Sequence, residues 1–381
     1  MMERVDVVAM RPYGNSGSRF LHGLFDQCDA IAILPMFVDA YEFCSKEKGA
    51  LTPEEYLELF EKNNCGLFDL REGYFCANLP EDSDQNLKNI DRTRFCSTFS
   101  DLCHIYGDCG RREFFLLLHL ALHLTRGRSM DTLTLILVHL HAFVALIHRR
   151  ADQRRGKLST KGLTIFFEDF PRAKFIATMR DPLCYYETSV FLSEERSEKF
   201  LRDYVFGSVW VWSLFYDRWT PEREIFLLKI TDLHRHFDQV MKALSLFLGV
   251  PHDPSIREAT ILGNRTVNVS KKQKSTANTV NPNFVDWKGG VISEYQISII
   301  RFFFRDIIQT FFPENVKSLR LIDYLRVGKF WLFSPLFLFN TLSPRAFYYD
   351  TWQKVKGFVR GYPKVKKFHS LGIERAKTYE S

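Results

Sequence analysis

The sequence predicts an α/β protein with a central parallel sheet of about four or five strands flanked by helices. Short apolar runs with the character of buried strands recur along the chain, and two of them lead through turn residues into helical patterns. The chain has 381 residues, enough for one large domain with extensions. Its 46% apolar and 25% charged residues are typical of a globular protein.

The first strand-to-turn-to-helix pattern lies at the start of the chain. Residues 5–10 predict a buried strand, and apolar residues from Phe20 onward recur at helical spacing. Between them, Gly14 and Gly17 permit a tight loop and close approach of a ligand to the backbone. The free N–H groups and the dipole of a helix N-terminus favour a bound anion. The loop therefore predicts a phosphate site, although it lacks the Gly-Lys-Ser/Thr of a Walker A motif.

The second pattern lies in the middle of the chain. Residues 174–179 predict a strand, which places Arg180 at its carboxyl end, where open α/β sheets bind their ligands. Pro182 suits the first position of the next helix, where its missing N–H is tolerated. Thr188 follows Arg180 by eight residues, about two helical turns.

These patterns resemble, in order, motifs of the sulfotransferase family that uses 3′-phosphoadenosine 5′-phosphosulfate, and with two further segments they cover about residues 4–290. The similar segments are Gly-Asn-Ser-Gly-Ser-Arg-Phe-Leu at 14–21 (the 5′-phosphosulfate loop), Phe-Pro-x-Ala-Lys-Phe-Ile-x-x-x-Arg-Asp-Pro at 170–182 (the 3′-phosphate site), 227–233 with 247–251, and Asp286-Trp287-Lys288. The resemblance implies a P-loop-NTPase-like fold of the bacterial carbohydrate or small-molecule type. It also implies sulfonate transfer to a hydroxyl of a glycan, glycolipid or small metabolite, with 3′-phosphoadenosine 5′-phosphate as product and no metal required.

The resemblance also implies the site residues. Backbone N–H groups from Asn15 to Arg19 would hold the 5′-phosphate, and Arg180 with Thr188 would hold the 3′-phosphate, with Ser189 as the alternative hydroxyl. A basic loop within 263–290 would close over the nucleotide. The implied cofactor-binding set is Gly14, Asn15, Ser16, Gly17, Ser18, Arg19, Phe20, Arg180, Thr188, Ser189, Arg265, Lys271 and Lys272.

Two departures from the family concern the chemistry. Asn15 stands where many members carry Lys or Arg, so Arg19, with Arg11 as second candidate, would supply the cation. The implied catalytic group is Arg19, Asn15 and Ser18. Residues 156–161 contain neither His nor a carboxylate, so no acceptor base is identified. The alternatives are a non-catalytic nucleotide- or glycan-binding relative and, from the loop geometry, a nucleotide kinase.

The remaining elements belong to a catalytic domain over 1–318. Residues 64–111 are expected to form loops with short elements, and a helical insertion is expected at about 112–155. His139 and His141 in that insertion are interpreted as core or surface groups. The other predicted elements are a strand at 29–35, a helix at 52–63 opened by a capping box, helices at 112–127 and 130–150, a long helix at 194–219, a strand at 225–230, and a helix capped by Asp232 that ends at Gly249.

Charge and cysteine usage limit the partners and the compartment. The net charge of +7 suits an anionic cofactor, an acidic acceptor or an anionic membrane. The eight cysteines form no Cys-x-x-Cys pair, and His119 with His123 lacks a third ligand, so no metal site is predicted. Free thiols and an early first strand favour a cytoplasmic enzyme without an N-terminal anchor.

The segment 319–381 forms a basic aromatic extension, expected to be helical. Its apolar run at 330–339 is too short to span a bilayer and has cations on both sides. The pattern favours contact of residues 326–367 with the inner face of an anionic membrane. A packing surface or a homodimer contact is the alternative. No nucleic-acid partner is predicted.

Overall fold

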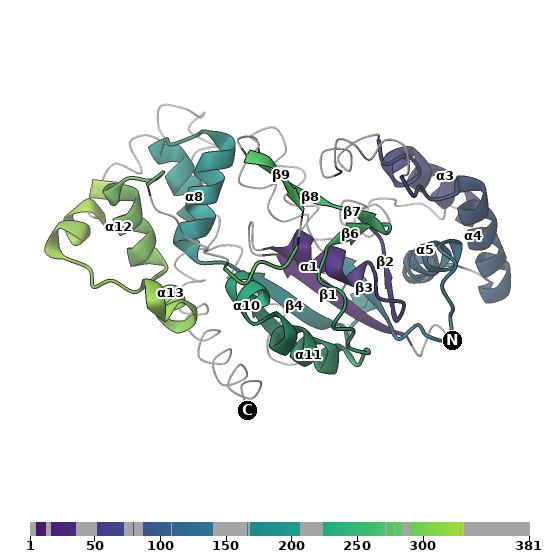
Figure 1. The fold of residues 1–381 in the computed structure, drawn as a ribbon. Coiled ribbons are helices and arrows are strands. Elements are labelled where there is room, and N and C mark those ends of the chain that lie inside the picture. The colour runs from purple at the N-terminus through teal and green to yellow at the C-terminus, as the bar shows by residue number, and fades with distance from the viewer. Residues whose placement is uncertain are drawn as a thin grey trace, which may run out of the picture.

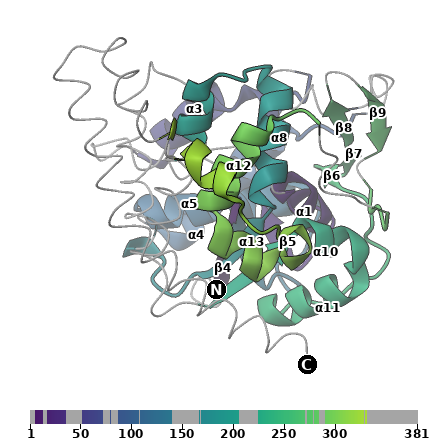
Figure 2. The same cartoon turned by 90° about the vertical axis from the view of Figure 1, so that its left-hand side faces the viewer.

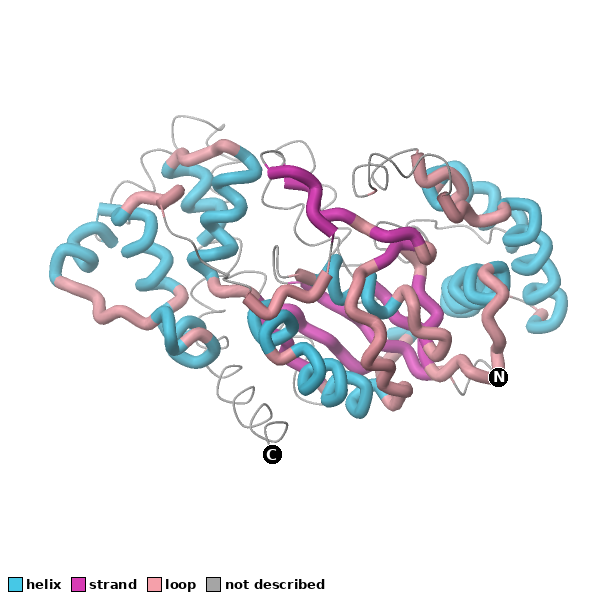
Figure 3. Tube along the Cα trace, in the orientation of Figure 1, coloured by secondary structure: helices cyan, strands magenta, loops and turns pink. Residues whose placement is uncertain are grey.

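The computed structural model describes residues 5–12, 17–35, 52–71, 79, 87–107, 109–139, 166, 168–205, 224–270, 273–277, 279–283, 290–327 and 329–330. Its centre is a five-stranded, all-parallel sheet in the order β2-β3-β1-β4-β5 (Figures 1 and 3). The strands are β1 (Asp6–Pro12), β2 (Ile31–Ile33), β3 (Leu135–His139), β4 (Lys174–Met179) and β5 (Ile225–Lys229). The predicted α/β fold with four or five parallel strands is confirmed.

Helices cover both faces of the sheet, because successive side chains of each strand point to opposite faces. In β1, Val8 and Met10 enter one apolar cluster and Ala9 enters the other. Figure 2 shows α10 and α11 on one side of the sheet and α4 and α5 on the other. The first face carries α1 (Ser18–Phe25), α10 (Ile230–Arg235) and α11 (Phe237–Leu248). The second cluster includes residues of α3 (Pro53–Asn63), α4 (Arg92–Tyr106), α5 (Arg111–Thr125), α8 (Pro182–Ser193), α12 (Glu294–Phe303) and α13 (Arg305–Phe311).

Short elements complete the described fold. They are the 3₁₀ turns η2 (Cys65–Leu67) and η5 (Pro313–Asn315), the pair β6 (Thr260–Ile261) with β7 (Asn264–Arg265), and the hairpin of β8 (Val267–Ser270) with β9 (Gln273–Ala277). The hairpin falls inside the polar segment predicted at 263–290, whose residues Lys271 and Lys272 lie outside the described residues.

Helix ends follow the predicted capping chemistry in most places. Thr52 and Glu55 form the capping box of α3. Gly249 ends α11 with φ of 70°, a conformation that favours glycine. One prediction about this region is wrong: Asp232 does not cap the helix but lies inside α10, and a second helix, α11, follows.

The helix predicted at 130–150 is wrong over its described part. Residues Leu135–His139 form β3, the strand between β2 and β1, so the expected helical insertion at 112–155 is interrupted by the central sheet. A strand buried on both faces is a continuous apolar run, which has no period to distinguish it from a buried helix. The first helix of the pair, α5, is confirmed. Residues 140–150 lie outside the described residues.

The expectation of loops over 64–111 is wrong as well, because α4 occupies fifteen residues of that segment. Asp91 caps its start and Gly107 follows its end. Its buried residues Phe95, Phe99 and Leu102 recur at helical spacing. The signal was present in the sequence, but exposed polar residues between these positions obscured it.

The helix predicted at 194–219 begins later than expected. Glu194 has φ of 58°, which ends α8, and the next helical turn starts at 198. The Ser197 hydroxyl caps it by accepting from the N–H of Phe200 at 3.1 Å. Residues 206–223, which include the rest of this predicted helix, lie outside the described residues.

The C-terminal extension begins as a helix over 321–327 that packs against α12, and residues 331–381 lie outside the described residues. Among the helices that are described, none is long and apolar enough to cross a membrane. Within the same residues, no cluster of His, Cys, Asp and Glu is placed to hold a metal. The described cysteines are free thiols: Cys28, Cys65, Cys96, Cys103, Cys109 and Cys184.

Candidate functional site

The candidate site lies where the strand order reverses. The chain leaves β1 for β2 on one side of the sheet and leaves β4 for β5 on the other. β1 and β4 are nevertheless neighbours, with Pro12 in register with Thr178. Ligands of open α/β sheets bind at such a switch point, at the carboxyl ends of the strands. The start of α1 and Arg180 after β4 therefore lie at the same sheet edge.

Gly17 starts α1 and cannot be replaced without strain. Its φ is 77°, and a Cβ there would lie 1.9 Å from Cδ1 of Ile230, the first residue of α10. Both the left-handed backbone and the close approach require glycine. The first turn of α1 thus rests directly on the segment that follows β5.

The first turn of α1 is suited to an external anion. Gly17 has no side chain that could cap the helix, and the residues that follow it, Ser18, Arg19 and Phe20, include no carboxylate. The first N–H groups of a helix have no intrahelical partners, and they carry the positive end of the dipole. Ser18 is buried and Arg19 is exposed in this turn. The arrangement is a helix start with amides, a hydroxyl and a cation but no negative group.

The turn after β4 is built differently. Asp181 is fully buried and caps α8, its Oδ1 accepting from the N–H groups of Leu183 at 2.6 Å and Cys184 at 3.4 Å. Its Oδ2 accepts from the Asn315 side-chain amide at 2.8 Å. The predicted start of this helix at Pro182 is confirmed. Arg180, partly exposed, lies between the end of β4 and this cap.

The two hydroxyl candidates on α8 differ in their surroundings. Ser189 is buried, and its hydroxyl donates to the Tyr185 carbonyl at 2.9 Å, one turn earlier. Thr188 is half-buried on the same helix. Because the Ser189 proton is used within α8, the geometry favours Thr188 as the donor to a ligand.

Arg265, the other described residue of the predicted site, is not brought to the first turn of α1. Arg265 pairs with Glu258 at 3.1 Å, and its backbone pairs with Thr260 beside the C-terminal end of α1. Predicted residues that lie outside the described residues are Gly14, Asn15, Ser16, Lys271 and Lys272. The described part of the predicted site is therefore Gly17 to Phe20 with Arg180, Thr188 and Ser189.

His139 is a further residue of this edge that the sequence interpretation assigned to the core or surface. It is the last residue of β3 and lies in register with Met10 of β1. Its ring packs edge-on against His22, one turn after Ser18 on α1, with centroids 5.6 Å apart. The signal was its position after the apolar run Leu-Ile-Leu-Val, which becomes visible once that run is assigned to a strand.

Burial keeps the neighbouring histidine neutral. His22 is bonded through Nε2 to the Leu34 carbonyl at 3.0 Å. Burial lowers its pKa to about 4, against smaller opposing contributions from Asp26 and Leu34. His139 therefore lies against an uncharged ring at neutral pH.

The far end of α1 is fixed by a buried carboxylate. Asp26 Oδ1 accepts from Arg126 at 2.7 Å, and Oδ2 accepts from Thr260 at 2.6 Å and from the N–H of Gly263 at 2.8 Å. Burial alone would raise the pKa of Asp26, but Arg126 and these hydrogen bonds lower it overall. The network holds α1, the turn after α5 and the β6–β7 turn together, and so fixes the direction of α1.

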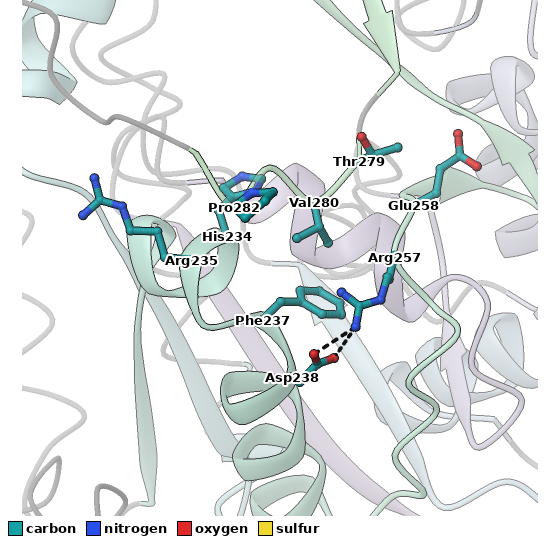
Figure 4. Close-up of a pocket in the computed structure, with 9 residues that line it drawn as sticks. All are labelled: His234, Arg235, Phe237, Asp238, Arg257, Glu258, Thr279, Val280 and Pro282. Atoms are coloured by element: carbon teal, nitrogen blue, oxygen red, sulfur yellow. Dashed lines mark hydrogen bonds and ion pairs between the residues drawn. The ribbon is translucent and has the colours of Figure 1, made fainter.

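A pocket of about 350 Å³ lies beside the first turn of α1 (Figure 4). Phe20 stacks on His234 of α10, with centroids 4.7 Å apart, and His234 Nδ1 accepts from the N–H of Asn281 at 3.2 Å. Arg257 pairs with both oxygens of Asp238 at 2.6 and 2.9 Å on the pocket floor. The pocket thus lies between the described segment 279–283 and α10, which contacts α1 through Phe20.

Comparison with known proteins gives similarity to solved structures alone. No family model matches the sequence, and no curated protein matches it. The crystal structure of the sulfotransferase STF9 from Mycobacterium avium aligns with 83% of this chain and 78% of that chain, at 11% sequence identity and a TM-score of 0.35. The chain is similar in fold to this sulfotransferase, at a TM-score too low to carry an argument about activity.

Proposed function

We propose that this protein is a sulfotransferase that moves a sulfonate group from 3′-phosphoadenosine 5′-phosphosulfate to a hydroxyl of a glycan, glycolipid or small metabolite. The observation that carries the proposal is the pairing of β1 with β4. It brings an uncapped helix start and an arginine together at a switch point. A nucleotide with two separate phosphate groups needs two such anion sites side by side.

The residues present fit this donor. The amides of the first turn of α1, with the Ser18 hydroxyl, would hold the 5′-phosphate. The guanidinium of Arg180, with the Thr188 hydroxyl, would hold the 3′-phosphate through charge-assisted hydrogen bonds. Bound there, the donor supplies a sulfonate that passes to the acceptor oxygen as its bond to the 5′-phosphate breaks.

The chain contributes position and charge to that transfer. Arg19, exposed in the first turn of α1, would stabilise negative charge that develops on the leaving 5′-phosphate. A cation at a helix N-terminus is unfavourable by itself, and a bound anion reverses this. Arg19 thereby takes the role of the Lys or Arg that many family members carry at the position of Asn15.

His139 is the proposed proton acceptor. It is the half-buried last residue of β3, and β3 is the other neighbour of β1 at this edge. The unprotonated nitrogen of its ring would take the proton of the acceptor hydroxyl as the oxygen attacks. The neutral His22 beside it adds no positive charge that would oppose this role.

Release of 3′-phosphoadenosine 5′-phosphate from the donor, in the presence of pooled hydroxyl acceptors, tests the proposal. Arg180→Ala should weaken donor binding about 10- to 100-fold, because a charge-assisted hydrogen bond contributes about 1.5–3 kcal/mol. The matched control is Arg172→Ala, an exposed arginine before the amino end of β4, which should bind as the wild type does. Equal affinity of wild type and Arg180→Ala would reject the site.

The proton acceptor has its own test. His139→Gln should lower kcat about 100-fold or more with donor affinity unchanged, since a general base contributes about 10²–10⁴ in rate. His252→Gln is the control: His252 follows α11, whose end lies at the amino edge of β4, where Lys174 donates to the Phe247 carbonyl at 3.0 Å. Donor binding without turnover against any acceptor would instead favour a non-catalytic nucleotide-binding relative.

A further inference from the structure

Exposed apolar side chains gather in one segment of the molecule. Of the seven large apolar residues exposed in the described part of the chain, five lie between positions 316 and 325. Leu321 is 78% exposed and Leu325 is 62% exposed, one helical turn apart. The five residues are Val316, Leu321, Ile322, Tyr324 and Leu325. Single exposed apolar residues need no explanation, but a continuous group of this kind indicates a contact surface.

The orientation of this helix is fixed by its opposite side. Asp323 accepts from the Ser298 hydroxyl of α12 at 2.6 Å and from the N–H of Arg320 at 2.8 Å. Val327 and Phe330 are buried, and Phe330 packs against Phe303 of α12 with centroids 5.7 Å apart. Residues 323, 327 and 330 share one side of a helix with about 100° per residue. The helix cannot turn to bury its outward leucines without breaking these contacts.

The exposed charged side chains of residues 315–330 are cations. Lys317, Arg320 and Lys329 are exposed, and Lys329 follows Leu325 by one helical turn. Asp323 is the one carboxylate between positions 315 and 330, and it is buried and bonded to Ser298 and Arg326. The outward side of the segment therefore combines apolar side chains with cations and has no exposed carboxylate.

We propose that residues 316–329 form a docking surface for an anionic lipid bilayer. Leu321, Ile322 and Leu325 enter the boundary between headgroups and acyl chains, and Lys317, Arg320 and Lys329 contact the lipid phosphates. A second copy of the chain fits less well, because a two-fold contact places the same cations opposite one another. The surface is independent of the proposed sulfonate transfer, and it lies upstream of most of the segment 326–367 for which the sequence predicts membrane contact.

Sedimentation of the full chain with vesicles tests this surface. We expect the chain to bind vesicles of phosphatidylcholine with about 30% phosphatidylglycerol, and to bind pure phosphatidylcholine vesicles much more weakly. The double variant Leu321→Glu/Leu325→Glu should lower the vesicle partition coefficient at least about tenfold, because two apolar side chains that would transfer from water into the bilayer are lost. Lys329→Gln should lower it about fivefold, the contribution of one cation near the surface.

The control is Leu246→Glu, which changes a leucine that is 75% exposed on α11, away from this surface. It should bind as the wild type does, and circular dichroism should show the same helix content in all variants. Three results overturn the proposal: wild-type chain that stays in solution with anionic vesicles, undiminished binding of the Leu321→Glu/Leu325→Glu variant, or light scattering that shows a dimer which this variant converts to a monomer.

Discussion

Two helices begin at the same edge of the sheet, and their first turns are built in opposite ways. α8 starts with a buried carboxylate, since Asp181 accepts from the N–H groups of Leu183 and Cys184. α1 starts at Gly17, which has no side chain, and its first turn contains the cation of Arg19 and no carboxylate. The dipole of α8 is thus complemented by Asp181, whereas the described first turn of α1 supplies no negative group of its own.

The difference assigns separate roles to the two turns. At α8 the amides are used by Asp181, so the positive charge offered to a ligand comes from the Arg180 side chain that precedes the cap. At α1 the proposed binding group is the backbone itself, and the first turn packs closely on Ile230 at Gly17. A ligand that spans both turns needs one anionic group near each.

The largest effect on stability is expected at Gly17, where α1 does not tolerate a side chain. Gly17→Ala should lower the free energy of unfolding by about 2–5 kcal/mol, from about 1–2 for the left-handed backbone and about 1–3 for the contact with Ile230. Urea denaturation measures it. Gly127→Ala is the matched control, because Gly127 has the same φ of 77° and a Cβ there would meet nothing within 4 Å. Equal losses in the two variants would show that the Ile230 contact is unimportant.

Removal of the N-terminal cap of α8 should have the next largest effect on stability. Asp181→Ala should cost about 1–2 kcal/mol of stability through the lost N-cap. Asp91→Ala removes the corresponding cap of α4, which accepts from the N–H of Arg94 at 3.0 Å at an exposed site. Asp181 should matter more, since it is buried and also bonds Asn315. The reverse order in thermal melting would contradict the contrast between the turns.

The contrast can also be broken by design. Arg19→Glu gives the first turn of α1 a negative charge, as α8 has, and should weaken binding of 3′-phosphoadenosine 5′-phosphate about tenfold or more. Stability should stay within about 0.5 kcal/mol, because the residue is on the surface. Arg94→Glu, in the exposed first turn of α4, is the control. Unchanged affinity in Arg19→Glu would remove α1 from the binding site.

The smallest effect concerns pH. Burial lowers the pKa values of His22 and His119 to about 4, below that of an unfolded histidine, so the unfolded state binds more protons between about pH 6.5 and 4. Stability should therefore fall as the pH falls through this window. α1 and α5 carry these histidines and α8 carries none. Hydrogen exchange, corrected for its intrinsic rate, should rise at pH 5 in α1 and α5 more than in α8.

The sequence predicts where several helices begin or end better than it predicts whether a buried apolar segment forms a helix or a strand. Thr52, Pro182 and Gly249 mark helix boundaries because capping is local chemistry that the residues themselves carry out. The run before His139 could not be assigned in this way, because a strand buried on both faces has no period. Its neighbours in the sheet decide its structure.

The same limit explains which residues of the candidate site could be predicted from the sequence. Gly17, Arg19 and Arg180 were predicted because each follows or precedes a recognisable element. His139 was not, since its place at the sheet edge depends on pairing with β1. Arg265 was predicted from its position along the chain, yet the β6–β7 turn places it beside the other end of α1.

We propose that the first turns of α1 and α8 together bind one nucleotide through its two anionic groups. Calorimetric titration of the wild-type chain with 3′-phosphoadenosine 5′-phosphate, and separately with AMP, tests it most directly. We expect saturable binding of 3′-phosphoadenosine 5′-phosphate that is at least about tenfold tighter than that of AMP, because the Arg180 turn is proposed to bind the 3′-phosphate. Equal affinities, or no heat with either nucleotide, would contradict it.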